Sequence, residues 1–302
     1  MRLRHSDPAK PGWTRRRHGS GFRYVDAAGK PLAAEAVARV KALVIPPAWR
    51  EVWICPHPNG HIQAVGYDDA GRRQYLYHEK WRADRDAEKF DRVLKLAPRL
   101  GRFREQIEKD MKSRGRKRLL AIALRMLDLG IFRVGHEQYV EDGTHGVATL
   151  LCEHLSVRGD RVRFQFPAKS GVQVDEEITD PQLARAVRSL LKGQTPDCRV
   201  FDLTADDVNE RFRELVGDEF SVKDLRTWHA TVHAAQAFKE HGKPSKRAVG
   251  RVMKEVAGHL GNTAAVTRKS YVDPRLTEAF ENGEVIGNGD PERATRRLLK
   301  QT

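Results

Sequence analysis

The stretch LLAIALRMLDLG, residues 119–130, is apolar on most sides of the helix that its composition favours. A helix of this kind is usually buried, so we expect the segment in the core of a domain, with Gly130 as its C-cap. The residues just before it, SRGRKR (113–118), fit either a basic loop or the start of this helix. The segment therefore predicts a helical core around which the neighbouring elements are arranged.

Upstream of this helix the pattern changes twice. Residues 83–113 show apolar residues at helical spacing, interrupted by Pro98, whereas residues 22–80 are β-rich. We expect a hairpin around Ala28-Gly29, a short helix over 33–43, and three strands turned at 58–60 and 68–71. The first 22 residues are basic and broken by Pro and Gly, which predicts a mobile arm.

Downstream, the segments 147–157, 161–168 and 172–178 predict a three-stranded β meander. Helices follow, with Thr204 as one N-cap and Ser221 and Asp224 as a capping box for the next. At 302 residues the chain exceeds what one hydrophobic core usually serves. We therefore predict an α+β protein of two domains. A small β-rich N-terminal domain with a basic arm spans residues 1–86, and a larger, mainly α domain carrying the meander spans residues 87–302.

The charge balance points to a polyanionic partner. The chain has 55 Lys and Arg against 41 Asp and Glu, a formal net charge of +14. This excess favours nucleic acid first and an acidic membrane surface second. The three cysteines are widely spaced and form no disulfide framework, and no apolar run is long enough to span a bilayer. We expect a cytoplasmic, nucleoid-associated protein.

The segment TRKSYVDP, residues 267–274, places Tyr271 among basic residues. A phenol is a weak nucleophile at neutral pH, so attack on a phosphodiester needs help from its surroundings. Arginines suit the charge that develops on the phosphate oxygens, and an acid must protonate the leaving alkoxide. A tyrosine that attacks DNA therefore predicts arginines, a further donor and an acid elsewhere in the chain.

Candidates for these groups occur in the order Arg133, Lys169, Arg226, Asn262, Tyr271. Each has an ordinary alternative, and singly each alternative is the simpler interpretation. Arg133 fits a solvated helix end, and Arg226 fits a surface salt bridge to Asp224 or a neighbour. Lys169 fits an exposed turn, and Asn262 fits a cap of the following helix. Only the ordered set argues for a site.

The set and its surroundings resemble a type IB DNA topoisomerase of the short poxvirus and bacterial kind. The resemblance spans about residues 45–275. It is carried by GYDDAGRRQYLYH (66–78), FRVGHEQYVEDGTHGVATL (132–150), FQFPAKSG (164–171), VKDLRTW (222–228) and LGNTAAVTRKSYVDP (260–274). Poxvirus members carry histidine where this chain has Asn262, and asparagine is typical of bacterial members. An amide can donate to a phosphate oxygen but cannot transfer a proton.

The resemblance implies a mechanism. Tyr271 would attack the scissile phosphate and form a 3′-phosphotyrosyl link, releasing a 5′-hydroxyl strand that swivels before religation. Arg133, Arg226 and Asn262 would hold the non-bridging oxygens, and Lys169 would protonate the 5′-oxygen. The resemblance also implies that the enzyme needs neither metal nor nucleotide, and that it binds double-stranded DNA as a monomeric clamp. The DNA contacts that it implies are Gln74, Tyr75, Tyr77, Tyr139 and Lys223.

Two other functions compete with this one. A site-specific tyrosine recombinase uses nearly the same catalytic set, but it usually carries histidine where this chain has Lys223 and has a helical N-terminal domain. A non-catalytic basic DNA-binding protein would explain the charge but not the ordered set. Two metal motifs are weak, because HATVH (229–233) lacks the glutamate of HExxH and CPHPNGH (55–61) fits an ordinary hairpin.

Overall fold

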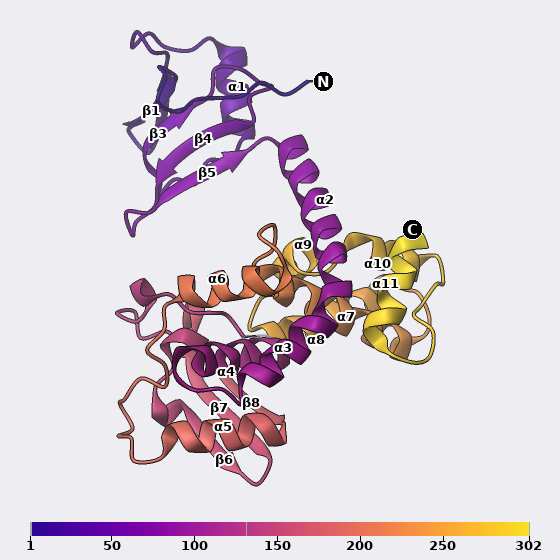
Figure 1. Cartoon of the computed structure of the whole chain (residues 1–302). Helices are drawn as coiled ribbons and strands as arrows, with labels where there is room; N and C mark the ends of the chain where they lie inside the picture. The colour runs from indigo at the N-terminus through magenta and orange to yellow at the C-terminus, as the bar shows by residue number, and fades with distance from the viewer. Residues whose placement is uncertain (1, 131, 302) are drawn as a thin grey trace. The chain divides into compact units, whose positions relative to one another are not determined.

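The computed structural model describes residues 2–130 and 132–301 and divides the chain into two compact units, Met1–Glu88 and Lys89–Thr302. Each unit has its own hydrophobic core. The first is a β-sheet unit and the second is mainly helical with a three-stranded sheet (Figure 1). The predicted α+β fold class is confirmed.

The first unit is built on a five-stranded antiparallel sheet of order β2-β1-β3-β4-β5. A small core that includes Val40, Val52 and Ile54 lies between this sheet and helix α1. The elements are β1 (Trp13–His18), β2 (Gly21–Val25), α1 (Ala34–Ala42), β3 (Arg50–Ile54), β4 (Ile62–Tyr67), β5 (Arg73–Tyr77) and the start of α2 (Glu79–Leu96).

The expectation of a mobile arm over the first 22 residues is wrong for β1. Strand β1 pairs with both β2 and β3, so it lies inside the sheet. One of its arginines, Arg15, finds partners within the unit. The guanidinium of Arg15 donates to the carbonyl oxygens of Pro46 and Trp49 at 2.9 and 2.7 Å and lies 4.1 Å from the Phe22 ring centroid. Basic composition alone therefore did not distinguish a strand from an arm.

The hairpin expected around Ala28-Gly29 forms only in part. The turn is present, with Gly29 at φ 80°, but the pairing beyond it is a single bridge between Val25 and Pro31. Proline has no backbone N–H, so it cannot continue the ladder. The real partner of β2 is β1, joined through a turn at Gly19, which has φ 58°.

The apolar helix over residues 119–130 lies in the core of the second unit. Helix α4 starts at Gly115, so the basic segment before Leu119 begins the helix and is not a loop. The helices are α3 (Leu100–Asp110), α4 (Gly115–Gly130), α5 (Pro181–Leu191), α6 (Ala205–Val216), α7 (Val222–His241), α8 (Lys246–Leu260), α9 (Ala264–Ser270), α10 (Pro274–Glu281) and α11 (Pro291–Gln301).

The predicted meander is present as the antiparallel sheet β6-β7-β8, although its first strand is shorter than expected. The strands are β6 (Leu155–Arg158), β7 (Arg161–Ala168) and β8 (Val172–Thr179). Short 3₁₀ turns occupy η1 (Ala97–Arg99), η2 (Glu137–Tyr139), η3 (Val147–Thr149), η4 (Cys152–His154) and η5 (Lys169–Gly171). Turn η1 lies at Pro98, where the sequence predicted the helical interruption.

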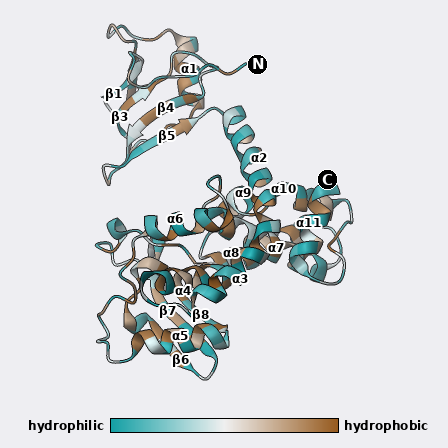
Figure 2. Cartoon of the chain, in the orientation of Figure 1, coloured by the Kyte–Doolittle hydropathy of each residue, from teal (hydrophilic) through white to brown (hydrophobic). Residues whose placement is uncertain are grey.

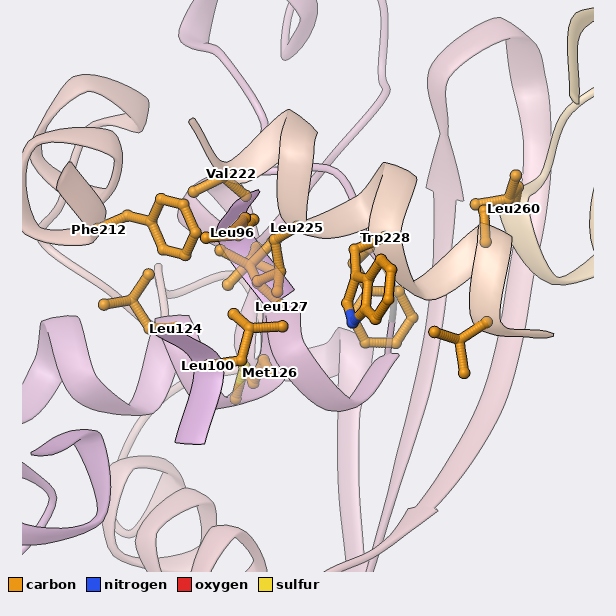
Figure 3. Packing of buried hydrophobic residues seen from close by; sticks show 14 of the residues in the cluster. Leu96, Leu100, Leu124, Met126, Leu127, Phe212, Val222, Leu225, Trp228 and Leu260 are labelled. Carbon is orange, nitrogen blue, oxygen red and sulfur yellow. The ribbon is translucent and has the colours of Figure 1, made fainter. Parts of the chain in front are cut away.

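Helix α7 is the central element of the second core. Its buried residues lie on most of its circumference. Leu225 packs beside Leu96 and Leu127, and Trp228 lies farther along the same helix (Figure 3). The predicted capping box fixes where α7 begins, since Ser221 N donates to the Asp224 carboxylate at 2.9 Å. By contrast, α2 is largely hydrophilic along its length (Figure 2).

We predict that Leu225→Ala lowers the free energy of unfolding by about 2–5 kcal/mol, because it leaves a cavity in this core. Leu225 is fully buried, whereas Val285 is 38% exposed. Val285→Ala is therefore the control and should change stability by less than about 0.5 kcal/mol. Denaturant unfolding of both variants measures the difference, and equal losses would contradict the packing described here.

Candidate active site

Arg226 projects from α7 and is buried, with only 6% of the residue exposed. Its guanidinium donates to the Leu260 carbonyl and is hydrogen-bonded to the Tyr271 side chain, whose ring centroid lies 5.6 Å away. The suggested surface salt bridge to Asp224 is wrong, because Asp224 pairs instead with Arg92 and Ser221. Burial and the nearby charge of Arg133 lower the pKa of Arg226 to about 10, so the side chain stays cationic at neutral pH.

Tyr271 caps the C-terminal end of α9, and α7 holds its backbone in place. Its amide donates to the Thr267 carbonyl at 3.0 Å. Its own carbonyl accepts from Thr231 Oγ1 at 3.2 Å, and the same hydroxyl accepts from Asp273 N at 3.3 Å. Thr231 is buried on α7, five residues after Arg226. One helix therefore supplies both the cation beside the phenol and the anchor of the tyrosine backbone.

Arg133 comes from the loop after α4, and two glycines hold this loop in place. The Arg133 carbonyl accepts from Val147 N at 3.0 Å, and the Val134 carbonyl accepts from Ala148 N at 2.7 Å. The backbones of Gly135 and Gly146 approach each other closely next to these bonds. A Cβ on Gly146 would lie 2.5 Å from Gly135 N and 2.7 Å from the Arg133 carbonyl oxygen. Burial lowers the pKa of Arg133, an effect that the Tyr271 side chain opposes.

Asn262 joins this group through Arg133. Its Oδ1 accepts from Arg133 Nη2 at 2.5 Å, so its amide nitrogen remains as a donor. That nitrogen is buried and has no hydrogen-bond partner among the described residues. The alternative role of Asn262 as a helix cap is wrong, because Thr263 caps α9 and accepts from Val266 N.

Lys169 lies at the tip of the β7–β8 hairpin and is exposed. Its ammonium lies 5.0 Å from the centroid of the Tyr139 ring, close enough for a cation–π contact. The hairpin tip and the segments that carry Arg133, Arg226 and Tyr271 line a common cleft of about 350 Å³. Of the predicted residues, it is lined by Arg133, Tyr139, Lys169, Lys223, Arg226 and Tyr271. Asn262 does not line this cleft and reaches the site through Arg133.

The predicted DNA contacts of the first unit lie on β5, outside this cleft. Tyr75 and Tyr77 are 39% and 37% exposed, and their rings stack with centroids 5.9 Å apart, as the two-residue step predicted. The Arg73 guanidinium lies 5.3 Å from the Tyr75 ring centroid. The Gln74 amide donates to Asp68 at 2.9 Å. Arg73, Tyr75 and Tyr77 form an exposed aromatic and basic surface on one face of the strand, whereas the half-buried Gln74 lies on the other face.

The histidines of the weak metal motif HATVH have other contacts in the structure. His229 Nε2 lies 2.9 Å from Asp128 Oδ1, and the His233 ring lies against that of His259 with centroids 4.3 Å apart. Over residues 2–130 and 132–301, no three His, Cys, Asp or Glu side chains gather in a way that could hold a metal ion. None of the helices in that part of the chain combines the length and the apolarity of a membrane span.

Comparison with known proteins identifies the family. The model of the eukaryotic DNA topoisomerase I catalytic core matches residues 78–282, and that of the bacterial DNA topoisomerase IB N-terminal domain matches residues 21–68. The chain belongs to the type IB DNA topoisomerases. It is 26% identical to DNA topoisomerase 1B of Acanthamoeba polyphaga mimivirus over 296 residues, covering 89% of this chain and 88% of the relative. It is 27% identical to DNA topoisomerase 1B of vaccinia virus (strain Copenhagen) over 232 residues, 72% of each chain.

The type IB DNA topoisomerases relax DNA, so this chain is an isomerase whose substrate is DNA. The prediction of a type IB topoisomerase in its bacterial form is confirmed, and the recombinase alternative is set aside. The cleft fits such a substrate, because the guanidiniums of Arg133 and Arg226 and the exposed ammonium of Lys169 face one small space beside a phenol. A phosphodiester is the anion that this set of donors suits.

Sequence analysis missed the residues that support this topoisomerase site. Thr231 looked like an ordinary helix residue, and Gly135 and Gly146 lay unremarked inside the matching segment 132–150. The two glycines could have been found, since glycine at a close backbone approach is a recurrent pattern. The contact of Thr231 with Tyr271 joins residues 40 apart in sequence and has no local signal.

We predict that Gly146→Ala slows DNA cleavage by the topoisomerase and destabilises it by about 1–3 kcal/mol, since the added methyl overlaps the backbone that holds Arg133. Gly101→Ala is the matched control, because a Cβ there meets nothing within 4 Å. Single-turnover cleavage and thermal unfolding should separate the two variants. A Gly146→Ala enzyme that cleaves at the wild-type rate would show that the glycine contact does not hold Arg133 in place.

Proposed function

We propose that this topoisomerase relaxes supercoiled DNA through a covalent 3′-phosphotyrosyl intermediate formed by Tyr271. The phenolic oxygen attacks the scissile phosphorus, the bond from phosphorus to the 5′-oxygen breaks, and the released strand swivels. The 5′-hydroxyl then attacks the phosphotyrosine and reseals the strand. The observation that carries this proposal is the contact of a buried guanidinium, Arg226, with the Tyr271 phenol.

Three donors stabilise the phosphate in this scheme. Arg133 and Arg226 donate to the non-bridging oxygens and offset the charge that builds up as the fifth oxygen approaches. The free amide N–H of Asn262 adds a neutral donor. Since an amide cannot transfer a proton, Asn262 takes no part in acid or base steps.

Lys169 is the general acid of the proposed reaction. It lies on the hairpin tip, separate from the helices that carry Arg226 and Tyr271, and lines the same cleft. In-line displacement needs the leaving oxygen opposite the nucleophile, so the acid must come from a different element. Lys169 gives its proton to the 5′-oxygen on cleavage and recovers it on religation. The phosphodiester bond energy stays in the phosphotyrosine, so neither nucleotide nor metal enters the scheme.

We further propose that residues 1–86 and 87–302 act as a monomeric clamp around the duplex. Gln74, Tyr75 and Tyr77 of β5 contact DNA from the first unit, and Tyr139 and Lys223 contact phosphates beside the cleft. The net charge of +14 supports this arrangement. Relaxation must work on many sequences, so most of these contacts go to the backbone and not to base edges.

We predict that Tyr271→Phe abolishes both relaxation and covalent adduct formation while DNA binding survives. The variant removes only the atom that bonds to phosphorus, and its ring still packs beside Arg226. Tyr24→Phe, in the first unit, is the control and should behave as wild type. Gel analysis of the protein–DNA adduct measures the outcome, and adduct formation by Tyr271→Phe would rule out this nucleophile.

We predict that Lys169→Ala slows cleavage of ordinary DNA by about 10²–10⁴-fold, the usual contribution of a general acid. A substrate with sulfur at the 5′-bridging position leaves as a thiolate and needs little protonation, so Lys169→Ala should cleave it near the wild-type rate. Lys192→Ala, an exposed lysine at the end of α5, is the control. Equal defects on the oxygen and sulfur substrates would show that Lys169 is not the acid.

A further inference from the structure

The C-terminal half of helix α2 carries two adjacent charged residues that contact the two segments bearing the proposed catalytic groups. Asp91 Oδ1 lies 3.0 Å from Arg275 Nη1, four residues after Tyr271. Arg92 Nη2 lies 2.8 Å from Asp224 Oδ1, two residues before Arg226. No role in the reaction described so far accounts for this pair of contacts.

The contact between Arg92 and Asp224 fixes the start of α7. The Asp224 side chain is 5% exposed, and its second oxygen accepts from Ser221 N and Ser221 Oγ, both at 2.9 Å. The carboxylate therefore caps the helix that carries Arg226 while bonding to α2. A buried carboxylate needs a charged partner, since an unpaired one is strongly unfavourable. Arg92 consequently determines where the first turn of α7 lies relative to α2.

The contact between Asp91 and Arg275 involves the segment that follows Tyr271. Arg275 donates to the Asp273 carboxylate from Nε and Nη2 at 3.0 and 2.7 Å. Its Nη1 donates to Asp91. Asp273 caps α10, and its amide donates to Thr231, the residue that also holds the Tyr271 carbonyl. The chain immediately after Tyr271 is thus fastened to α7 through Thr231 and to α2 through Asp91.

The end of α2 is itself immobilised by apolar packing. Phe90, Val93 and Leu96 are its buried residues, and Leu96 lies with Leu225 of α7 in the central cluster (Figure 3). The apolar contacts fix the distance between the two helices but leave rotation and sliding weakly determined. Ion pairs with defined partners restrict those motions, because a hydrogen bond weakens steeply when its geometry changes.

We propose that Asp91 and Arg92 are positioning residues for the cleavage step. Their two ion pairs fasten α2 to the start of α7 and to the segment after Tyr271, and so set the distance and angle between Arg226 and the attacking phenol. The inference rests on the roles proposed above for Arg226 and Tyr271. Neither Asp91 nor Arg92 touches the reacting atoms, so both act through other residues.

The test uses the full chain with Arg92→Ala and Asp91→Ala. Single-turnover formation of the covalent adduct is measured at saturating protein, beside DNA affinity and the thermal unfolding midpoint. Arg92→Ala should slow cleavage by about 10–100-fold, since small displacements of reacting groups have effects of this size. Asp91→Ala should slow it by about 2–5-fold, because its pair is more exposed and weaker. DNA affinity should change little in either variant.

Lys95→Ala and Asp84→Ala are the matched controls, since both side chains are exposed on the same helix. They should cleave within about twofold of wild type. Arg92→Lys keeps the charge and should recover part of the rate. If Arg92→Ala fails to fold, Asp91→Ala still tests the proposal, because the loss of its more exposed ion pair leaves the protein folded at the assay temperature.

Two further readouts separate positioning from general loss of structure. The defect of Arg92→Ala should persist well below its unfolding midpoint, and it should persist on the 5′-sulfur substrate that rescues Lys169→Ala. Sulfur removes the need for a proton but does not realign the phenol. Wild-type cleavage by both folded variants, or rescue of Arg92→Ala by sulfur, would overturn the inference. Failure of the proposed chemistry is distinct, because it would appear as adduct formation by Tyr271→Phe.

Discussion

The buried guanidinium of Arg226 is the constraint on which the site depends. A cation removed from water is unfavourable unless nearby groups replace its hydration, and here the Leu260 carbonyl and the Tyr271 phenol do so. Both come from segments that pack on α7, so the helix core and the site are assembled together. Arg133 adds a second positive charge, which lowers the pKa of Arg226 further. Two like charges at close range oppose each other unless an anion lies between them, so the pair of guanidiniums suits a phosphate.

The site divides into a rigid part and an exposed part. Arg226 and Tyr271 lie on helices fixed by the core and by Thr231, whereas Lys169 lies on a hairpin tip beside the Tyr139 ring. This division suits the proposed chemistry. The nucleophile and its cation must stay aligned through cleavage and religation, whereas the acid has only to reach the leaving oxygen.

Helix starts and strand turns could be predicted from the sequence because their signals are local. Thr204, Ser221 and Asp224 cap the helices as expected, and the meander turns where glycine and charged residues predicted. Strand β1 was missed because its three consecutive arginines resemble a solvated tail, and the carbonyls that satisfy Arg15 lie some 30 residues away. The ordinary alternative for Arg226, a salt bridge to Asp224, does not form. Asp224 lies nearby in sequence but bonds to Arg92, 132 residues earlier. Long-range polar contacts of this kind leave no periodic pattern.

Those long-range contacts also explain why a hydrophilic helix lies against the catalytic elements. An apolar interface on α2 would hold α7 and the Tyr271 segment in place, but it would tolerate sliding and would not discriminate between neighbouring arrangements. Adjacent residues of opposite charge, Asp91 and Arg92, each accept only one kind of partner, so exchanging the two segments is electrostatically unfavourable. Since α2 begins at Glu79 in the first unit, the helix that leads into the second unit also bonds to the segments that carry Arg226 and Tyr271. The order of the two charges on α2 thereby specifies that Asp91 bonds to the segment after Tyr271 and that Arg92 bonds to the start of α7.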